Sequence, residues 1–106
     1  MSWVRALPLA ELPVGETRLV ELADEYVLVC RVGENELYAV ENVCSHDDGP
    51  LGEGELDGSI IECPRHGARF DVATGAVVRL PAASVLATFR VRISDGWIEV
   101  YLEDES

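Results

Sequence analysis

The chain has 106 residues, 48% of them apolar, and a formal net charge of −12; all eight basic residues are arginine. This length predicts one domain with a modest core, and the apolar fraction excludes a disordered tail. The acidity argues against nucleic acid as a partner, because phosphate binding needs a basic patch.

The sequence also indicates the cellular compartment in which the protein is expected. No apolar run approaches the roughly 20 residues that span a bilayer, and residues 1–6 lack the basic and apolar regions of a signal peptide. Three cysteines are a poor set for disulfides, and in a reducing compartment such a set more often binds metal. We therefore expect a soluble cytoplasmic protein that binds neither membranes nor nucleic acid.

Period-2 alternation and turn signals fill the chain, which predicts short strands and an all-β fold. Turns are expected at Ala23-Asp24-Glu25, at residues 33–36, at Asp57-Gly58 and at Thr74-Gly75. The strands expected between these turns cover residues 17–22, 26–32, 37–40, 55–56, 59–62 and 76–80.

The C-terminal part predicts the clearest hairpin. Residues 87–94 alternate as one strand with a wet face, and Asp95-Gly96 is a strong two-residue turn signal. The return strand, residues 97–102, places Ile98, Val100 and Leu102 on one side. Only residues 8–11 and 81–85 leave room for a helical turn. The pattern is typical of a β-sandwich or a small barrel.

Both histidines and two of the three cysteines fall in one 23-residue window. It reads Cys44-Ser45-His46, then sixteen residues, then Cys63-Pro64-Arg65-His66. Thiolate and imidazole are the ligands that soft and borderline transition metals prefer. Each motif opens a loop, and the two loops follow strands of the predicted sheets, so they can close over one metal site.

Two kinds of metal site remain open from the residues alone. Two cysteines and two histidines could hold one structural zinc ion, but zinc sites usually keep like ligands close together in the sequence. Here each loop supplies one cysteine and one histidine. That arrangement suits an elongated two-iron cluster better than a single ion.

At these four residues the chain resembles the Rieske [2Fe–2S] family, whose signature is Cys-x-His followed later by Cys-x2-His. The segments that flank the two loops, such as Leu51-Gly52-Glu53-Gly54, are similar to those of small Rieske-type ferredoxins, and the similarity extends over nearly the whole chain. The resemblance implies a Rieske-like fold of small antiparallel sheets. It also implies a single domain over residues 1–106, with a two-loop cluster-binding subdomain at about 43–82.

By the same resemblance, one [2Fe–2S] cluster would be bound by four side chains. Cys44 and Cys63 would hold one iron, and His46 and His66 would hold the other.

The chain departs from Rieske subunits of cytochrome complexes at four positions. Gly49 and Arg65 stand where those subunits carry a disulfide, and Ala68 and Phe70 stand where they carry a serine and a tyrosine. Hydrogen bonds to sulfur favour the reduced cluster, so their loss lowers the potential. Within the Rieske range of roughly −150 to +300 mV we expect the low end, as in ferredoxins that serve aromatic-ring dioxygenases.

The expected function is one-electron transport without catalysis. The chain would pass electrons from a flavoprotein reductase to a terminal oxygenase or another oxidoreductase by transient docking. A redox-sensing or regulatory subunit is the alternative, and a zinc-binding structural module is a weaker one. Cys30 lies in an apolar stretch away from the motif and is expected to be a buried thiol.

Overall fold

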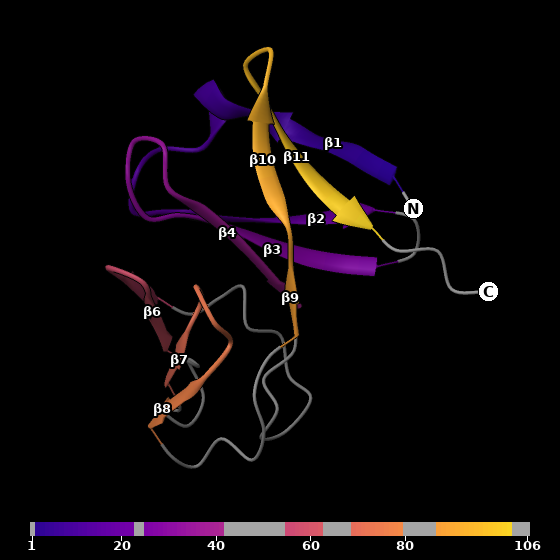
Figure 1. Cartoon of the computed structure of the whole chain (residues 1–106). Helices are drawn as coiled ribbons and strands as arrows, with labels where there is room; N and C mark the ends of the chain where they lie inside the picture. The colour runs from indigo at the N-terminus through magenta and orange to yellow at the C-terminus, as the bar shows by residue number, and fades with distance from the viewer. Residues whose placement is uncertain (1, 23–24, 42–54, 63–68, 80–86, 103–106) are drawn as a thin grey trace, which may run out of the picture.

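The structure is a computed structural model that describes residues 2–22, 25–41, 55–62, 69–79 and 87–102. These residues form three antiparallel sheets (Figure 1), which confirms the predicted all-β fold. Over the same ranges, no helix is long and apolar enough to cross a membrane.

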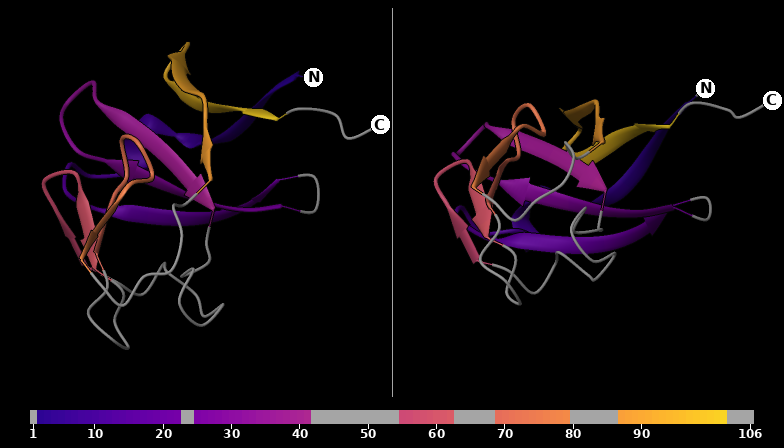
Figure 2. Two further views of the ribbon diagram at one scale, coloured as in Figure 1. Left: turned by 60° about the horizontal axis from the view of Figure 1, so that its bottom comes forward. Right: turned by 90° about the horizontal axis from the view of Figure 1, so that it is seen from below.

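Sheet B is the middle layer of the molecule, with its strands in the order β2-β3-β4-β9. It packs against sheet A on one face and against sheet C on the other (Figures 1 and 2). The first three strands agree with the predicted ones to within a residue at each end. The bounds are Thr17–Leu22 for β2, Glu25–Arg31 for β3, Leu37–Glu41 for β4 and Thr88–Phe89 for β9.

Strand β3 is buried on both of its faces. Val27 and Val29 belong to the core between sheets A and B, hereafter the A–B core. Leu28 and Cys30 belong to the core between sheets B and C, the B–C core. All four side chains are fully buried, which explains why the sequence is continuously apolar here and does not alternate.

Sheet A has the order β1-β11-β10 and covers one face of sheet B. Ile98, Val100 and Leu102 point into the A–B core, as the alternation predicts. Asp95 and Gly96 both have positive φ, 53° and 79°, as a tight two-residue hairpin turn requires. The bounds are Ser2–Pro8 for β1, Val91–Ser94 for β10 and Trp97–Leu102 for β11.

The sequence did not predict β1, and it predicted one strand where the structure has two. The pairing of β1 with β11 shifts register between Arg5 and Leu7, so the extra residue, Ala6, interrupts the period-2 pattern. The predicted strand 87–94 is divided at Arg90: β9 pairs with β4 in sheet B, and β10 pairs with β11 in sheet A. Alternation continues through Arg90, but it carries no information on which strand is the partner.

Sheet C has the order β5-β6-β7-β8. The predicted 55–62 hairpin is present, but Asp57 pairs with Ile60, so its turn lies at Gly58-Ser59, one residue later than expected. Strand β7 was not predicted. The bounds are Glu55–Asp57 for β5, Ile60–Glu62 for β6, Arg69–Asp71 for β7 and Val77–Arg79 for β8.

Two helical turns were considered in the sequence. The first is confirmed as a short 3-10 helix, η1, at Leu9–Glu11. The second, at residues 81–85, lies outside the described residues.

The Cys30 thiol is buried in the B–C core, as expected. Its Sγ atom lies 3.9 Å from the carbonyl oxygen of Leu28, and the side chain has no exposed surface. Burial raises the pKa of Cys30 from 9.0 to about 12, because the thiolate would lose its hydration. Cys30 is therefore an inert core thiol in the folded chain.

The Arg31 side chain ties η1 to the turn between β3 and β4. Its Nη1 donates to the carbonyl oxygens of Leu12 at 2.8 Å and Leu9 at 3.3 Å. Its Nη2 donates to the carbonyl oxygen of Glu34 at 2.8 Å. One half-buried cation thus holds two separate segments against the end of sheet B.

We predict that Arg31→Met lowers the free energy of unfolding by about 2–3 kcal/mol, because four carbonyls, including that of Gly33, lose a charged donor. Arg18→Met is the matched control, since Arg18 makes one exposed hydrogen bond, to the carbonyl of Glu11. It should cost about 0.5 kcal/mol or less. Urea unfolding of the two variants measures both free energies. Equal losses of unfolding free energy in the two variants would contradict the role given to Arg31.

We also predict that Cys30 makes folding sensitive to alkaline pH. The folded pKa lies above the unfolded one, so the stabilisation is complete below about pH 9 and is lost as pH rises toward 12. Between pH 8 and pH 10 the unfolding free energy should fall by about 1 kcal/mol more in the wild type than in Cys30→Val. Urea unfolding at several pH values measures this difference. If the unfolding free energy fell by the same amount in both proteins, the prediction would be contradicted, because the Cys30 thiol would not be desolvated.

Candidate metal centre

The four predicted ligands lie outside the described residues. Cys44 and His46 belong to the segment 42–54, and Cys63 and His66 belong to the segment 63–68. The structure does describe the residues at which these segments begin and end. These flanking residues show how the two segments are held.

Four strand ends stand in one row at one end of sheet C. Glu55 at the start of β5 pairs with Glu62 at the end of β6, and Glu62 pairs with Arg69 at the start of β7. Arg69 in turn pairs with Arg79 at the end of β8. Paired strands lie about 4.8 Å apart, so this strand-end row spans roughly 15 Å.

The strand-end row joins the two segments that contain the predicted ligands, hereafter the ligand-bearing segments. The first segment ends at Glu55, and the second begins after Glu62 and ends at Arg69. Cys63 is the residue that follows Glu62 in the chain. Backbone pairing of the sheet thus brings three of the four segment ends to one place.

The fourth end, where the first segment leaves sheet B, is also fixed. The Glu41 N–H donates to the carbonyl oxygen of Ala87 at 3.0 Å. The Ala87 N–H donates to Oε2 of Glu41 at 2.9 Å. These two bonds hold the start of the first segment beside the chain that enters β9.

An ion pair spans the ends of the second segment. Arg69 Nε lies 2.9 Å from Glu62 Oε1, and both side chains are nearly half exposed, at 44% and 42%. Such an exposed pair contributes about 1 kcal/mol or less to stability. Its effect is to keep two facing side chains in one arrangement at the base of the six residues between them.

The B–C core forms the floor beneath the strand-end row. Phe70, next to Arg69, is fully buried and packs with Ile61 of β6 and with Leu28 and Cys30 of β3. Because Phe70 points inward, its neighbour Arg69 points outward to Glu62. This short strand was not predicted from the sequence; the signal was an aromatic residue, Phe70, between two charged residues.

The four predicted ligands suit a two-iron cluster, and the described part of the chain offers no competing metal site. Within the described ranges, no three histidine, cysteine or acidic side chains come together as a metal site. The fully buried Cys30 is not available as a thiolate ligand, because burial raises its pKa to about 12. Two thiolates and two imidazoles on adjoining segments provide soft and borderline ligands of the kind that iron–sulfur clusters take.

Comparisons with known proteins agree with this assignment. Residues 2–90 match the family model of the Rieske [2Fe-2S] domain. The chain is 38% identical over 104 residues to Ferredoxin CarAc of Metapseudomonas resinovorans, covering 97% of this chain and 94% of that one. It is also 38% identical over 103 residues to the ferredoxin component of biphenyl 2,3-dioxygenase of Rhodococcus jostii (strain RHA1), covering 97% and 95%.

The fold agrees with that of a solved relative. A chain in the complex of reduced oxygenase and oxidized ferredoxin in carbazole 1,9a-dioxygenase superimposes with a TM-score of 0.89 and 34% identity, covering 98% of this chain and 96% of that one. The predicted Rieske-like fold is therefore confirmed. The chain belongs to the Rieske [2Fe–2S] family, and it is a ferredoxin that carries electrons on one [2Fe–2S] cluster.

Proposed function

We propose that Cys44 and Cys63 hold one iron of the cluster and that His46 and His66 hold the other. The observation that carries this proposal is the strand-end row of sheet C, because it joins the two segments that contain these residues. The matched range of the family model also includes all four residues. When bound, the cluster supplies a one-electron couple, and the two neutral imidazoles make it less negative than an all-cysteine cluster.

We propose a potential at the low end of the Rieske range. Phe70 supports this value, because its ring is buried in the B–C core and carries no hydroxyl group that could donate to sulfur. Fewer hydrogen bonds to sulfur leave the reduced state less stabilised.

The proposed partners are a flavoprotein reductase as donor and a terminal oxygenase as acceptor. The two relatives are named as ferredoxins, one of them a component of a dioxygenase, and the solved relative is in a complex with an oxygenase. The chain itself would transform no substrate and would dock transiently. We propose that it works in the cytoplasm, a reducing compartment in which the thiols of Cys44 and Cys63 stay available as ligands.

We also propose that residues 1–106 act as one domain, with a cluster-binding subdomain at about 43–82. Sheet C, from Glu55 to Arg79, lies inside these limits. Strand β3 supports the single domain, because it contributes side chains to both cores.

The function is tested with purified protein, a flavoprotein reductase and a terminal oxygenase of the dioxygenase type. We predict a red-brown protein with iron and acid-labile sulfide in equal amounts, which sustains electron flow between the two enzymes. Cys63→Ser should lose the visible spectrum and the electron flow. The matched control, Cys30→Val, should keep both, because the buried Cys30 thiol is not one of the proposed ligands.

Two outcomes would contradict the proposal. A colourless protein with bound zinc would favour a structural module. A coloured, reducible protein that never sustains turnover with any reductase and oxygenase pair would favour a redox sensor.

We further predict that the two cores differ in their effect on the cluster. Ile61→Val in the B–C core and Ile98→Val in the A–B core remove the same methylene from fully buried sites, and each should cost about 1 kcal/mol of stability. Only Ile61→Val loosens the floor of the strand-end row. Iron release to a chelator should therefore be about fivefold faster in that variant, the rate equivalent of about 1 kcal/mol.

Equal iron-release rates in the two variants would contradict this role of the B–C core. Unfolding measured on the same samples shows whether the stability losses are indeed matched.

A further inference from the structure

The outer face of sheet A carries an unusual concentration of arginine and aromatic side chains. The face lies on the side of β11 opposite to Ile98 and Val100, which point into the A–B core. We refer to it as the arginine–aromatic face; its members are Trp3, Arg5, Arg90, Arg92, Trp97, Glu99 and Tyr101.

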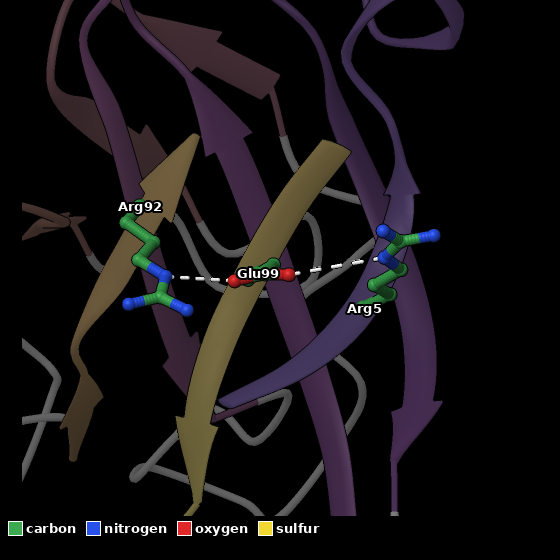
Figure 3. Close-up of polar contacts among 3 residues, drawn as sticks. All are labelled: Arg5, Arg92 and Glu99. Atoms are coloured by element: carbon green, nitrogen blue, oxygen red, sulfur yellow. Dashed lines mark hydrogen bonds and ion pairs between the residues drawn. The ribbon is translucent and has the colours of Figure 1, made fainter. Parts of the chain in front are cut away.

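Glu99 lies at the centre of this face, between two arginines from the neighbouring strands (Figure 3). Arg92 Nε is 2.7 Å from Oε1 of Glu99, and Arg5 Nε is 3.8 Å from Oε2. The Glu99 side chain is only 11% exposed. Both carboxylate oxygens are therefore engaged inside the face.

Aromatic rings hold the arginines in place. The guanidinium carbon of Arg92 lies 4.2 Å from the ring centroid of Trp3, and that of Arg5 lies 5.0 Å from the ring of Trp97. Arg90 lies 5.2 Å from the ring of Tyr101 and 5.8 Å from that of Trp3. These contacts reduce the rotamer entropy that an arginine loses when it binds a ligand.

The face is positive in a strongly acidic molecule. Three guanidiniums against one carboxylate leave it with a formal charge of +2, while the chain as a whole carries −12. The side chains of Arg5 and Arg92 remain 55% and 47% exposed. Among the described residues, Glu99 is the one carboxylate that pairs with these arginines. The guanidinium donors therefore exceed the carboxylate acceptors in the described part of this face.

We propose that the arginine–aromatic face is a docking surface for a protein segment rich in aspartate and glutamate. Arginine forks bind carboxylates in pairs of charge-assisted hydrogen bonds. Arginine, tryptophan and tyrosine are also the residue types that dominate the binding energy of protein interfaces. A nucleic acid is the poorer fit, because three arginines make too small a patch to neutralise an extended chain of phosphates.

The arginine–aromatic face and the strand-end row lie on different sheets, so two proteins could dock at the same time. Sheet B separates sheet A from sheet C, whose strand-end row supports the ligand-bearing segments. An acidic partner on sheet A would leave the strand-end row open to a second protein. The proposal does not rest on the identity of the electron donor or acceptor.

The two tryptophans make the test specific, because both tryptophans of the chain lie in this face. Holoprotein labelled with 5-fluorotryptophan should show two fluorine resonances. Titration with a short oligo-glutamate peptide at low ionic strength should shift both resonances saturably, and added salt should weaken the binding. An oligo-glutamine peptide of equal length should shift neither.

Arg90→Gln is the informative variant, since it removes one charge and leaves the Arg5–Glu99–Arg92 contacts intact. The affinity for oligo-glutamate should fall about fivefold, as expected for the loss of one solvent-exposed ion pair. Arg18→Gln, on β2 in sheet B, makes the same change in net charge and should bind as the wild type does.

The proposal is overturned if oligo-glutamate shifts neither resonance at millimolar concentration. It is equally overturned if Arg18→Gln weakens binding as much as Arg90→Gln, or if oligo-glutamine binds as well as oligo-glutamate.

Discussion

Strand β3 buries Val27 and Val29 against sheet A, and it buries Leu28 and Cys30 against sheet C. Sheet B therefore has no free face along this strand, and both outer sheets depend on it for their cores. A change in the register of β3 by one residue would exchange the two sets of side chains. The position of sheet C, and with it the supports of the metal centre, follows from this double burial.

Strand pairing in sheet C positions the ends of the two segments that contain the predicted ligands. Its strands are only three residues long, but their pairing brings Glu55, Glu62 and Arg69 into one row, so the two ligand-bearing segments share a support. The ion pair between Glu62 and Arg69 closes the base of the second segment, and Phe70 anchors it to the core. The opposite layer, sheet A, has a different chemistry, with arginines stacked on aromatic rings. The strand-end row, where we propose the metal centre, and the positive face thus lie on different sheets of the molecule.

The sequence predicts those features that depend on local chemistry. Three such predictions were confirmed: the Asp95-Gly96 turn, the alternation of β11 and the burial of Cys30. Each depends on residue types that are neighbours in the sequence. Strand β1 was missed because a register shift beside Ala6 breaks its alternation, and β7 because three residues are too few to show a period. The metal ligands were inferred from residue type and spacing. The strand-end row could not be inferred in this way, because it depends on cross-strand register.

We propose that both ligand-bearing segments serve one cluster, because they share a support, and selective labelling of histidine tests this most directly. His46 and His66 are the only histidines of the chain, so ¹⁵N-histidine introduces label at no other place. Pulsed electron paramagnetic resonance of the dithionite-reduced protein should show two strongly coupled ¹⁵N nuclei on a single paramagnetic centre. One coupled nitrogen, or none, would mean that the two segments do not meet at one cluster.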